Sequence, residues 1–328
     1  MPTTSGRNRS RSRSRHTAGS VRSIVVIGVA MAVAACAGPA PAGTVSADGL
    51  VALVGTSDDV TLLGWGTNAD DPISIELPKR DTTWIATGRA DVLAATLTDG
   101  SVATSNPVSL GVRPVTWRPV RAAGPNGDAP EGPEYFATWD PEGGRYATLA
   151  GNLAGGDAIR VVLVDPTVAS AFEIALDQPV VAAPPTWIDD DRLVVITGDT
   201  DRPSSTIVDA TTGGLAEGPA GARLLAASAD GHRIATMAGR GAPVVVRDTS
   251  GWLAGDGSSL ASIEPPDVGS SAIAIALDDG GERLAIAWAA ADGSVSLAVH
   301  GGASDWRRVA TPQIGSAQGA VVAWRRGG

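Results

Sequence analysis

The sequence predicts an all-β fold, namely a six-bladed β-propeller of four-stranded blades that is closed by pairing of the C-terminal strand with the first blade. Three observations predict it. A turn motif recurs along the chain, short apolar strands flank its copies, and one copy is divided between residues 46–54 and the C-terminal end. A motif split in this way allows a circular array of sheets to close without an unpaired edge.

The N-terminal segment is typical of an export signal. Residues 7–22 contain six arginines and no acidic residue, and residues 24–35 form an apolar run of twelve that ends at Cys36. A membrane-spanning helix needs about 20 apolar residues, so the shorter run indicates the core of a signal peptide. We therefore assign residues 1–35 to a signal peptide and expect an exported protein.

Cys36 is the expected lipidation site. The segment Val33-Ala-Ala-Cys36 resembles the lipobox of bacterial lipoproteins, although that family usually has leucine where Val33 stands. Cys36 is the only cysteine, so it cannot form an internal disulfide. An ordinary secretory signal with an incidental cysteine is the alternative. If Cys36 is lipidated, residues 36–45 are a flexible tether, and acyl chains hold the protein on the outer face of the cytoplasmic membrane.

The exported chain is strongly acidic. Without the six signal arginines, 19 basic residues remain against 35 acidic ones, which gives a net charge near −16. Nucleic-acid binding needs clustered cations that neutralise phosphates, so we expect no nucleic-acid partner. The remaining residues are numerous enough to bury a sizeable core, and we assign residues 46–328 to a single propeller domain that is expected to be monomeric.

The recurring element is a tight turn rich in Asp and Gly. Six copies lie near Asp48-Gly49, Gly88-Arg89, Glu142-Gly143, Asp190-Asp191, Asp230-Gly231 and Asp279-Gly280, with a partial seventh at Arg326-Gly327. Successive copies are about 40 to 54 residues apart, close to the roughly 40 to 50 residues of a four-stranded blade. Because the seventh copy matches the approach to the first, we expect six blades, with the Trp324 strand beside the strand that starts at Leu50.

Each turn has a strand on either side. The strand before the turn often ends in tryptophan, as at Trp84, Trp139, Trp187 and Trp324. A second strand follows, as at 192–197, 233–237 and 283–288, and a third, as at 159–164, 244–247 and 294–299. Asp and Gly in the turns fit the positive backbone angles of two-residue hairpins. No helical period persists beyond the signal segment, so helix is expected to be nearly absent.

The tryptophans have two interpretations. A large ring at the same place in each repeat fits packing between adjacent blades better than it fits ligand stacking. Four others, Trp65, Trp117, Trp252 and Trp306, lie outside that register. They are better candidates for an exposed aromatic contact than the repeat tryptophans are, although packing of outer strands is the favoured role for them as well.

The segments Trp139-Asp-Pro-Glu-Gly-Gly-Arg-Tyr-Ala, Ser228-Ala-Asp-Gly-His-Arg-Ile-Ala and Leu277-Asp-Asp-Gly-Gly-Glu-Arg-Leu-Ala resemble the repeat of TolB-type propellers. They also resemble the propeller repeat of actinobacterial LpqB-type lipoproteins. The resemblance implies an extracytoplasmic six-bladed protein that binds other envelope components. Both families carry a further domain before the propeller, so the TolB partnership is not transferred to this chain.

The residues indicate no catalytic machinery. His232 lies in a turn and His300 near a strand end. Neither belongs to a recognisable catalytic triad of a nucleophile, a base and a residue that orients the base. The two histidines that remain after the signal peptide cannot supply a three-histidine metal site. The acidic runs Asp189-Asp190-Asp191 and Asp278-Asp279 coincide with turns and lack the spacing of a calcium loop. We predict no catalytic residue, no metal site and no cofactor.

The leading functional hypothesis is therefore a non-enzymatic, membrane-tethered scaffold that binds an envelope protein, a peptide or a glycan. The alternative is a propeller hydrolase, lactonase or sugar dehydrogenase with calcium or a quinone on the propeller axis. That alternative requires carboxylates or asparagines from several blades to converge on one point, which the structure can show.

Overall fold

The computed structural model describes residues 47–56, 59–66, 71–75, 77, 82–87, 92–106, 117–120, 132–153, 159–166, 170–302 and 306–326. Cys36 and the segments assigned to the signal peptide and tether lie outside these residues, as does the turn at Gly88-Arg89. Their assignments therefore stay predictions. Within the described ranges, no helix has the length and apolar character needed to span a bilayer.

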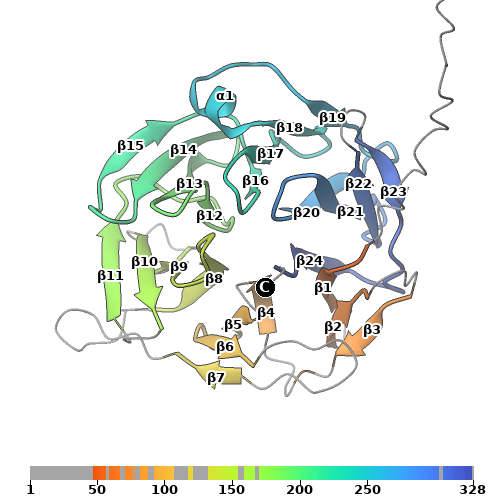
Figure 1. The fold of residues 1–328 in the computed structure, drawn as a ribbon, viewed down its shortest axis with the longest axis horizontal. Coiled ribbons are helices and arrows are strands. Elements are labelled where there is room, and N and C mark those ends of the chain that lie inside the picture. The colour runs from red at the N-terminus through yellow and green to blue at the C-terminus, as the bar shows by residue number, and fades with distance from the viewer. Residues whose placement is uncertain are drawn as a thin grey trace, which may run out of the picture. The chain divides into compact units, whose positions relative to one another are not determined.

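The described strands form six antiparallel sheets of four strands each, arranged in a ring around a common axis (Figure 1). We call these sheets blades 1 to 6 in chain order. The innermost strand of each blade contacts the innermost strands of its two neighbours, so these strands form a continuous inner ring. The prediction of a six-bladed propeller is confirmed.

The strands are assigned as follows. Blade 1 contains β24 (Gly319–Trp324), β1 (Leu50–Gly55), β2 (Val60–Gly64) and β3 (Ile73–Ile75), and blade 2 contains β4 (Thr82–Thr87), β5 (Leu93–Leu97), β6 (Val102–Ser105) and β7 (Trp117–Pro119). Blade 3 contains β8 (Glu134–Trp139), β9 (Tyr146–Ala150), β10 (Arg160–Asp165) and β11 (Ser170–Ala175), and blade 4 contains β12 (Thr186–Trp187), β13 (Arg192–Asp199), β14 (Arg202–Asp209) and β15 (Leu215–Gly218). Blade 5 contains β16 (Leu224–Ala227), β17 (Arg233–Met237), β18 (Val244–Asp248) and β19 (Ala261–Ile263), and blade 6 contains β20 (Ser271–Leu277), β21 (Arg283–Ala289), β22 (Val295–Gly301) and β23 (Arg307–Ala310).

Blade 1 is assembled from both ends of the domain. β24 pairs antiparallel with β1 in a continuous register that runs from Leu50 opposite Trp324 to Gly55 opposite Gly319. β24 is also the innermost strand of that blade, and it contacts β20 of blade 6 and β4 of blade 2. The predicted pairing beside Leu50 is confirmed, and it closes the ring.

The apolar core lies between the blades rather than in one central mass. On β1, Leu50 and Ala52 pack toward blade 6, whereas Val51 and Leu53 pack toward blade 2. Because successive side chains of a strand point to opposite faces of its sheet, a blade covered on both faces needs apolar residues at consecutive positions. This requirement explains the continuous apolar run that follows Gly49.

Three of the tryptophans outside the repeat register are buried. Trp65 is 0 %, Trp252 6 % and Trp306 4 % exposed, and each belongs to a core between two blades. The favoured role in packing is therefore confirmed for these three, and they make no exposed aromatic contact. Trp252 lies on α1 (Thr249–Leu253), a five-residue helix too short to produce a helical period in the sequence. The side chain of Trp117 is outside the described residues.

The turns also join neighbouring blades. Arg283 follows the turn of blade 6, and its guanidinium lies 4.3 Å from the ring centroid of Trp324 in blade 1. The same group donates to the carbonyl of Asp48 over 2.8 Å and pairs with Asp278 at 2.7 Å. Arg145 of blade 3 repeats this arrangement toward Trp187 of blade 4, at 5.6 Å from the ring. In blades 3 and 6 the arginine after the turn therefore contacts the tryptophan of the next blade.

Replacing Arg283 with alanine should lower the free energy of unfolding by about 2 kcal/mol, because a stacked cation and a charged hydrogen bond are lost together. Arg192 is the matched control, since it occupies the corresponding position in blade 4 but pairs with Asp189 of its own turn and is 48 % exposed. Arg192→Ala should cost less than about 1 kcal/mol. Urea denaturation measures both, and equal costs would contradict the role of Arg283 between blades.

Candidate functional site

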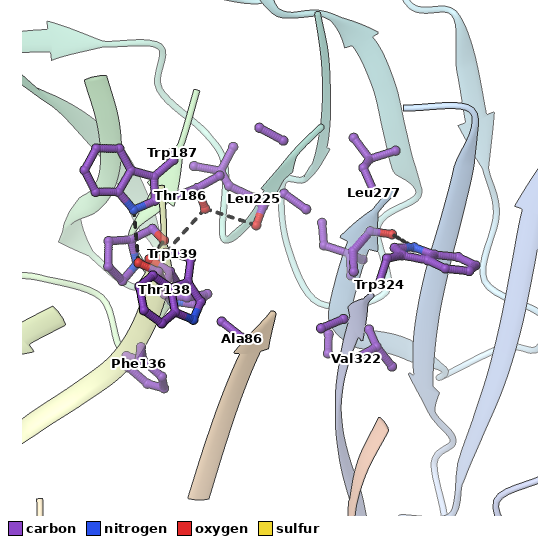
Figure 2. Close-up of a pocket in the computed structure, with 18 of the residues that line it drawn as sticks. Ala86, Phe136, Thr138, Trp139, Thr186, Trp187, Leu225, Leu277, Val322 and Trp324 are labelled. Atoms are coloured by element: carbon purple, nitrogen blue, oxygen red, sulfur yellow. Dashed lines mark hydrogen bonds between the residues drawn. The ribbon is translucent and has the colours of Figure 1, made fainter. Parts of the chain in front are cut away.

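The innermost strands of all six blades surround a cavity of about 260 Å³ on the propeller axis. Most of its lining is apolar, and side chains from separate blades face one another across it (Figure 2). All six innermost strands end at the same end of the cavity, where the turn or the chain terminus that follows each strand also lies. We call that end the turn mouth, and the end where these strands begin the start mouth.

Four tryptophans of the repeat, Trp84, Trp139, Trp187 and Trp324, line the cavity. Three of their indole N–H groups donate to main-chain carbonyls of a neighbouring blade. Trp84 donates to Ala137 over 3.2 Å, Trp187 to Thr138 over 3.1 Å, and Trp324 to Ala276 over 3.0 Å. The predicted role in packing between blades is therefore correct, and the same rings also form the cavity wall.

Trp139 differs from the other three. Its side chain is 6 % exposed, and among the residues that the structure describes no acceptor lies within hydrogen-bond distance of its Nε1 atom. A buried donor without a partner costs free energy. The Nε1 atom has almost no accessible surface, so an acceptor on a ligand reaches it only when the cavity wall shifts.

The hydroxyl groups of two threonines on innermost strands bond to main-chain carbonyls of adjacent blades. Thr138 donates to the carbonyl of Pro185 over 3.0 Å, and Thr186 donates to the carbonyl of Leu225 over 3.3 Å (Figure 2). An innermost strand is a sheet edge, so its outward backbone groups need partners from elsewhere. Side chains of adjacent blades supply some of these partners, which makes the cavity wall continuous.

Bulges near the start mouth turn residues toward the axis. The register of β8 against β9 shifts between Tyr135 and Thr138, and Phe136 has a positive φ of 56°. Its ring lines the cavity and packs edge-on against Trp84, with centroids 5.2 Å apart. In β20 the shift skips Ile273, which also lines the cavity and is 38 % exposed. Bulges and strained residues of this kind concentrate at binding sites.

The turn mouth is polar. Arg326 follows β24, and Nη1 donates to the main-chain carbonyls of Asp140 over 2.6 Å and Pro141 over 2.8 Å in blade 3. Its Nε lies 4.0 Å from a carboxylate oxygen of Asp279 in blade 6. Arg326, Asp279 and Pro141 all line the cavity, so one end of an apolar cavity carries charged groups.

The histidines lie elsewhere. His232 is exposed in a turn, and His300 is buried in β22, where Nδ1 lies 3.2 Å from the carbonyl of Trp306. Burial lowers the pKa of His300. The acidic runs occupy turns as predicted, where Asp189 pairs with Arg192 and Asp278 with Arg283. Of these residues, only Asp279 lines the cavity, among the residues that the structure describes.

The axial metal or quinone site of the alternative hypothesis requires converging polar groups. Among the cavity-lining residues that are described, Asp279 is the one carboxylate, and asparagine is absent. The described part of the chain contains no group of three or more side chains able to hold a metal ion. The cavity as described therefore offers apolar contact, a few hydroxyls, one cation and one carboxylate.

Three contributors to the site were not predicted from the sequence. Phe136 and Ile273 face the axis because of bulges, and a bulge leaves no distinctive sequence pattern in these strands. Arg326 was grouped with a partial turn, although its charge near a predicted closing strand was a usable signal. Cys36, the predicted lipidation site, lies outside the described residues.

No protein-family model matches this chain, and no curated protein is significantly similar to it in sequence. Solved structures match its fold. TolB from Acinetobacter baumannii is 15 % identical, with a TM-score of 0.58 over 85 % of this chain and 66 % of the TolB chain, so this chain spans slightly less than two thirds of that length. A chain of the nidogen/laminin complex is 11 % identical, with a TM-score of 0.58 over 85 % of this chain and 100 % of that one. At these identities the likeness establishes the propeller fold, and the LpqB-like lipoprotein assignment stays a prediction.

The two indoles of Trp139 and Trp187 can be compared directly by replacing each with phenylalanine. Both side chains are similarly buried, at 6 % and 5 % exposed, but only Trp187 donates a hydrogen bond. Trp187→Phe should therefore lower the free energy of unfolding by about 1 kcal/mol more than Trp139→Phe does. Chemical denaturation provides the measurement, and a larger loss in Trp139→Phe would show that its N–H group is already satisfied.

Proposed function

We propose that this protein is an exported, lipid-anchored binding scaffold that holds an extended apolar segment of an envelope protein in its axial cavity. The observation that carries the proposal is a cavity lined by all six blades, with aromatic rings on its wall and bulged residues at its start mouth. Apolar cavities with a few placed polar groups are the usual form of binding sites. The hydroxyl groups of the described lining residues Thr138, Thr186 and Ser228 are already hydrogen-bonded within the protein, which favours binding over catalysis.

An extended polypeptide fits this cavity better than a glycan does. The lining offers apolar and aromatic side chains, while its hydroxyls at Thr138 and Thr186 are already bonded to protein carbonyls. A glycan would bring many hydroxyl groups that need partners, and burying them unpaired is costly. A polypeptide segment brings apolar side chains for the wall and carbonyl groups for the unpartnered Trp139 donor.

Site-specific photo-cross-linking tests the binding site. A benzoylphenylalanine residue at position 273 should capture a reproducible envelope protein through an internal or terminal segment of that protein. Val268 is the control position, because it is fully exposed at 102 % and does not line the cavity. The same capture at both positions, or none at 273, would contradict binding in the cavity.

A variant that fills the cavity gives a second measure of the same site. Ala86 points into the cavity (Figure 2), and Ala86→Phe should reduce the cross-link at position 273 at least about tenfold if the ligand occupies that space. Unchanged circular dichroism and thermal midpoint establish that the variant is folded. An undiminished cross-link would place the partner outside the cavity.

The lipid anchor is tested separately. The acyl chains on Cys36 would each contribute about 0.8 kcal/mol per buried methylene to membrane binding, so Cys36→Ala should move the protein from the membrane to the soluble fraction or leave it unprocessed. Fractionation and mass determination of the intact chain measure both results. Unaltered processing and membrane retention in Cys36→Ala would show that Cys36 is not the anchor.

A further inference from the structure

Arg326 crosses the turn mouth of the cavity. The residue belongs to the segment after β24 in blade 1, yet its guanidinium bonds to carbonyls of Asp140 and Pro141 in blade 3 and approaches Asp279 in blade 6. One side chain therefore connects three of the six blades. A ligand that entered at this end would have to break the two hydrogen bonds of Nη1.

The guanidinium still has unused hydrogen-bonding capacity. Its contacts with Asp140, Pro141 and Asp279 occupy Nη1 and Nε, and within the described chain no acceptor bonds to Nη2. The side chain is 17 % exposed, and burial lowers its pKa while Asp279 and Asp140 act to raise it. A guanidinium presents five N–H donors in a planar fork that matches a carboxylate. Arg326 thus presents a cation with free donors at one end of the cavity.

The start mouth has the opposite character. Phe136, Leu224 and Ile273 line the cavity near the beginnings of their strands, and the lining there includes no charged side chain among the described residues. Ile273 is 38 % exposed although it is a large apolar residue, and Phe136 keeps a strained backbone in the same region. The cavity is therefore apolar where it can be entered, and at the other end it carries the charges of Arg326 and Asp279.

We propose that the cavity binds the C-terminal end of a polypeptide, which enters at the start mouth and places its terminal carboxylate on Nη2 of Arg326. This inference rests on the proposed function and specifies which part of the partner is bound. The apolar wall, which includes Trp139, accommodates the last side chains of the segment. A carboxylate on an arginine forms a charge-assisted hydrogen bond, which is stronger than a neutral one.

The test uses two peptide mixtures on the purified folded chain. Both are N-acetylated pentapeptides randomised over Ala, Leu, Val, Phe and Ser, one with a free C-terminal carboxylate and one with a C-terminal amide. Peptides retained by the protein are identified by mass spectrometry, and the best acid is resynthesised in both forms. The acid should bind at least about tenfold more tightly than its amide, since a charged hydrogen bond is lost in the amide.

Two variants assign that preference to one side chain. Arg326→Gln keeps hydrogen-bond donors but removes the charge, and it should reduce the preference for the acid to less than about threefold. Arg325→Ala is the matched control, because the neighbouring arginine does not line the cavity, and it should keep the full preference. Circular dichroism and thermal midpoints establish folding of both. An undiminished preference in Arg326→Gln would overturn the assignment.

The remaining outcomes separate this inference from the proposed function. Equal binding of acid and amide to the wild-type chain would overturn the role of Arg326 while leaving the cavity as a peptide site. Retention of neither mixture, together with no cross-link at position 273, would reject peptide binding itself. Dodecanoate serves as a carboxylate on an apolar chain without amide groups. If dodecanoate displaces the bound acid peptide at a lower concentration than free acid peptide does, the site is one for fatty acids and the inference is wrong.

Discussion

The antiparallel pairing of β24 with β1 is the constraint on which the rest of the structure depends. It supplies blade 1 with its innermost strand, and that strand contacts the innermost strands of blades 2 and 6. Without it, the cores on both faces of β1 would lose part of their cover. The same strand places Trp324 in the cavity wall and brings Arg326 to the turn mouth. The pairing of β24 with β1 therefore both closes the ring and completes the candidate site.

The residues that join the blades also form the cavity. Trp187 and Trp324 bond to carbonyls of a neighbouring blade and lie beneath arginines that follow the preceding turn, yet each also contributes to the axial wall. A substitution at these positions changes stability and binding together. Trp139 and Arg326 are different, because each keeps donors that the described protein does not use. We therefore place ligand recognition on these two residues and assign the shared framework to stability.

The sequence predicted the ring but only part of the cavity. The repeated turns predicted six blades. The split motif predicted that the Trp324 strand pairs with the strand at Leu50, because the hydrogen-bond register of paired strands follows from their local apolar pattern. The two-residue strand β12 is too short to show a pattern, and Phe136 faces the axis through a bulge. The contact between Arg326 and Asp140 joins residues 186 positions apart. The role of Trp65 was predicted from its position along the repeat, whereas its burial depends on contacts with a neighbouring blade.

Hydrogen exchange of the β24 amides tests this account most directly, because local opening and global unfolding differ in free energy. If closure of the ring holds the fold together, the amides of Val321 and Ala323, which the antiparallel register directs toward β1, should exchange at the rate of those in β1, through global unfolding alone. The same protection should extend to strands of blades 2 and 6 that contact β24. Rapid exchange of β24 as a fraying terminus, while β1 and β2 stay protected, would contradict the account.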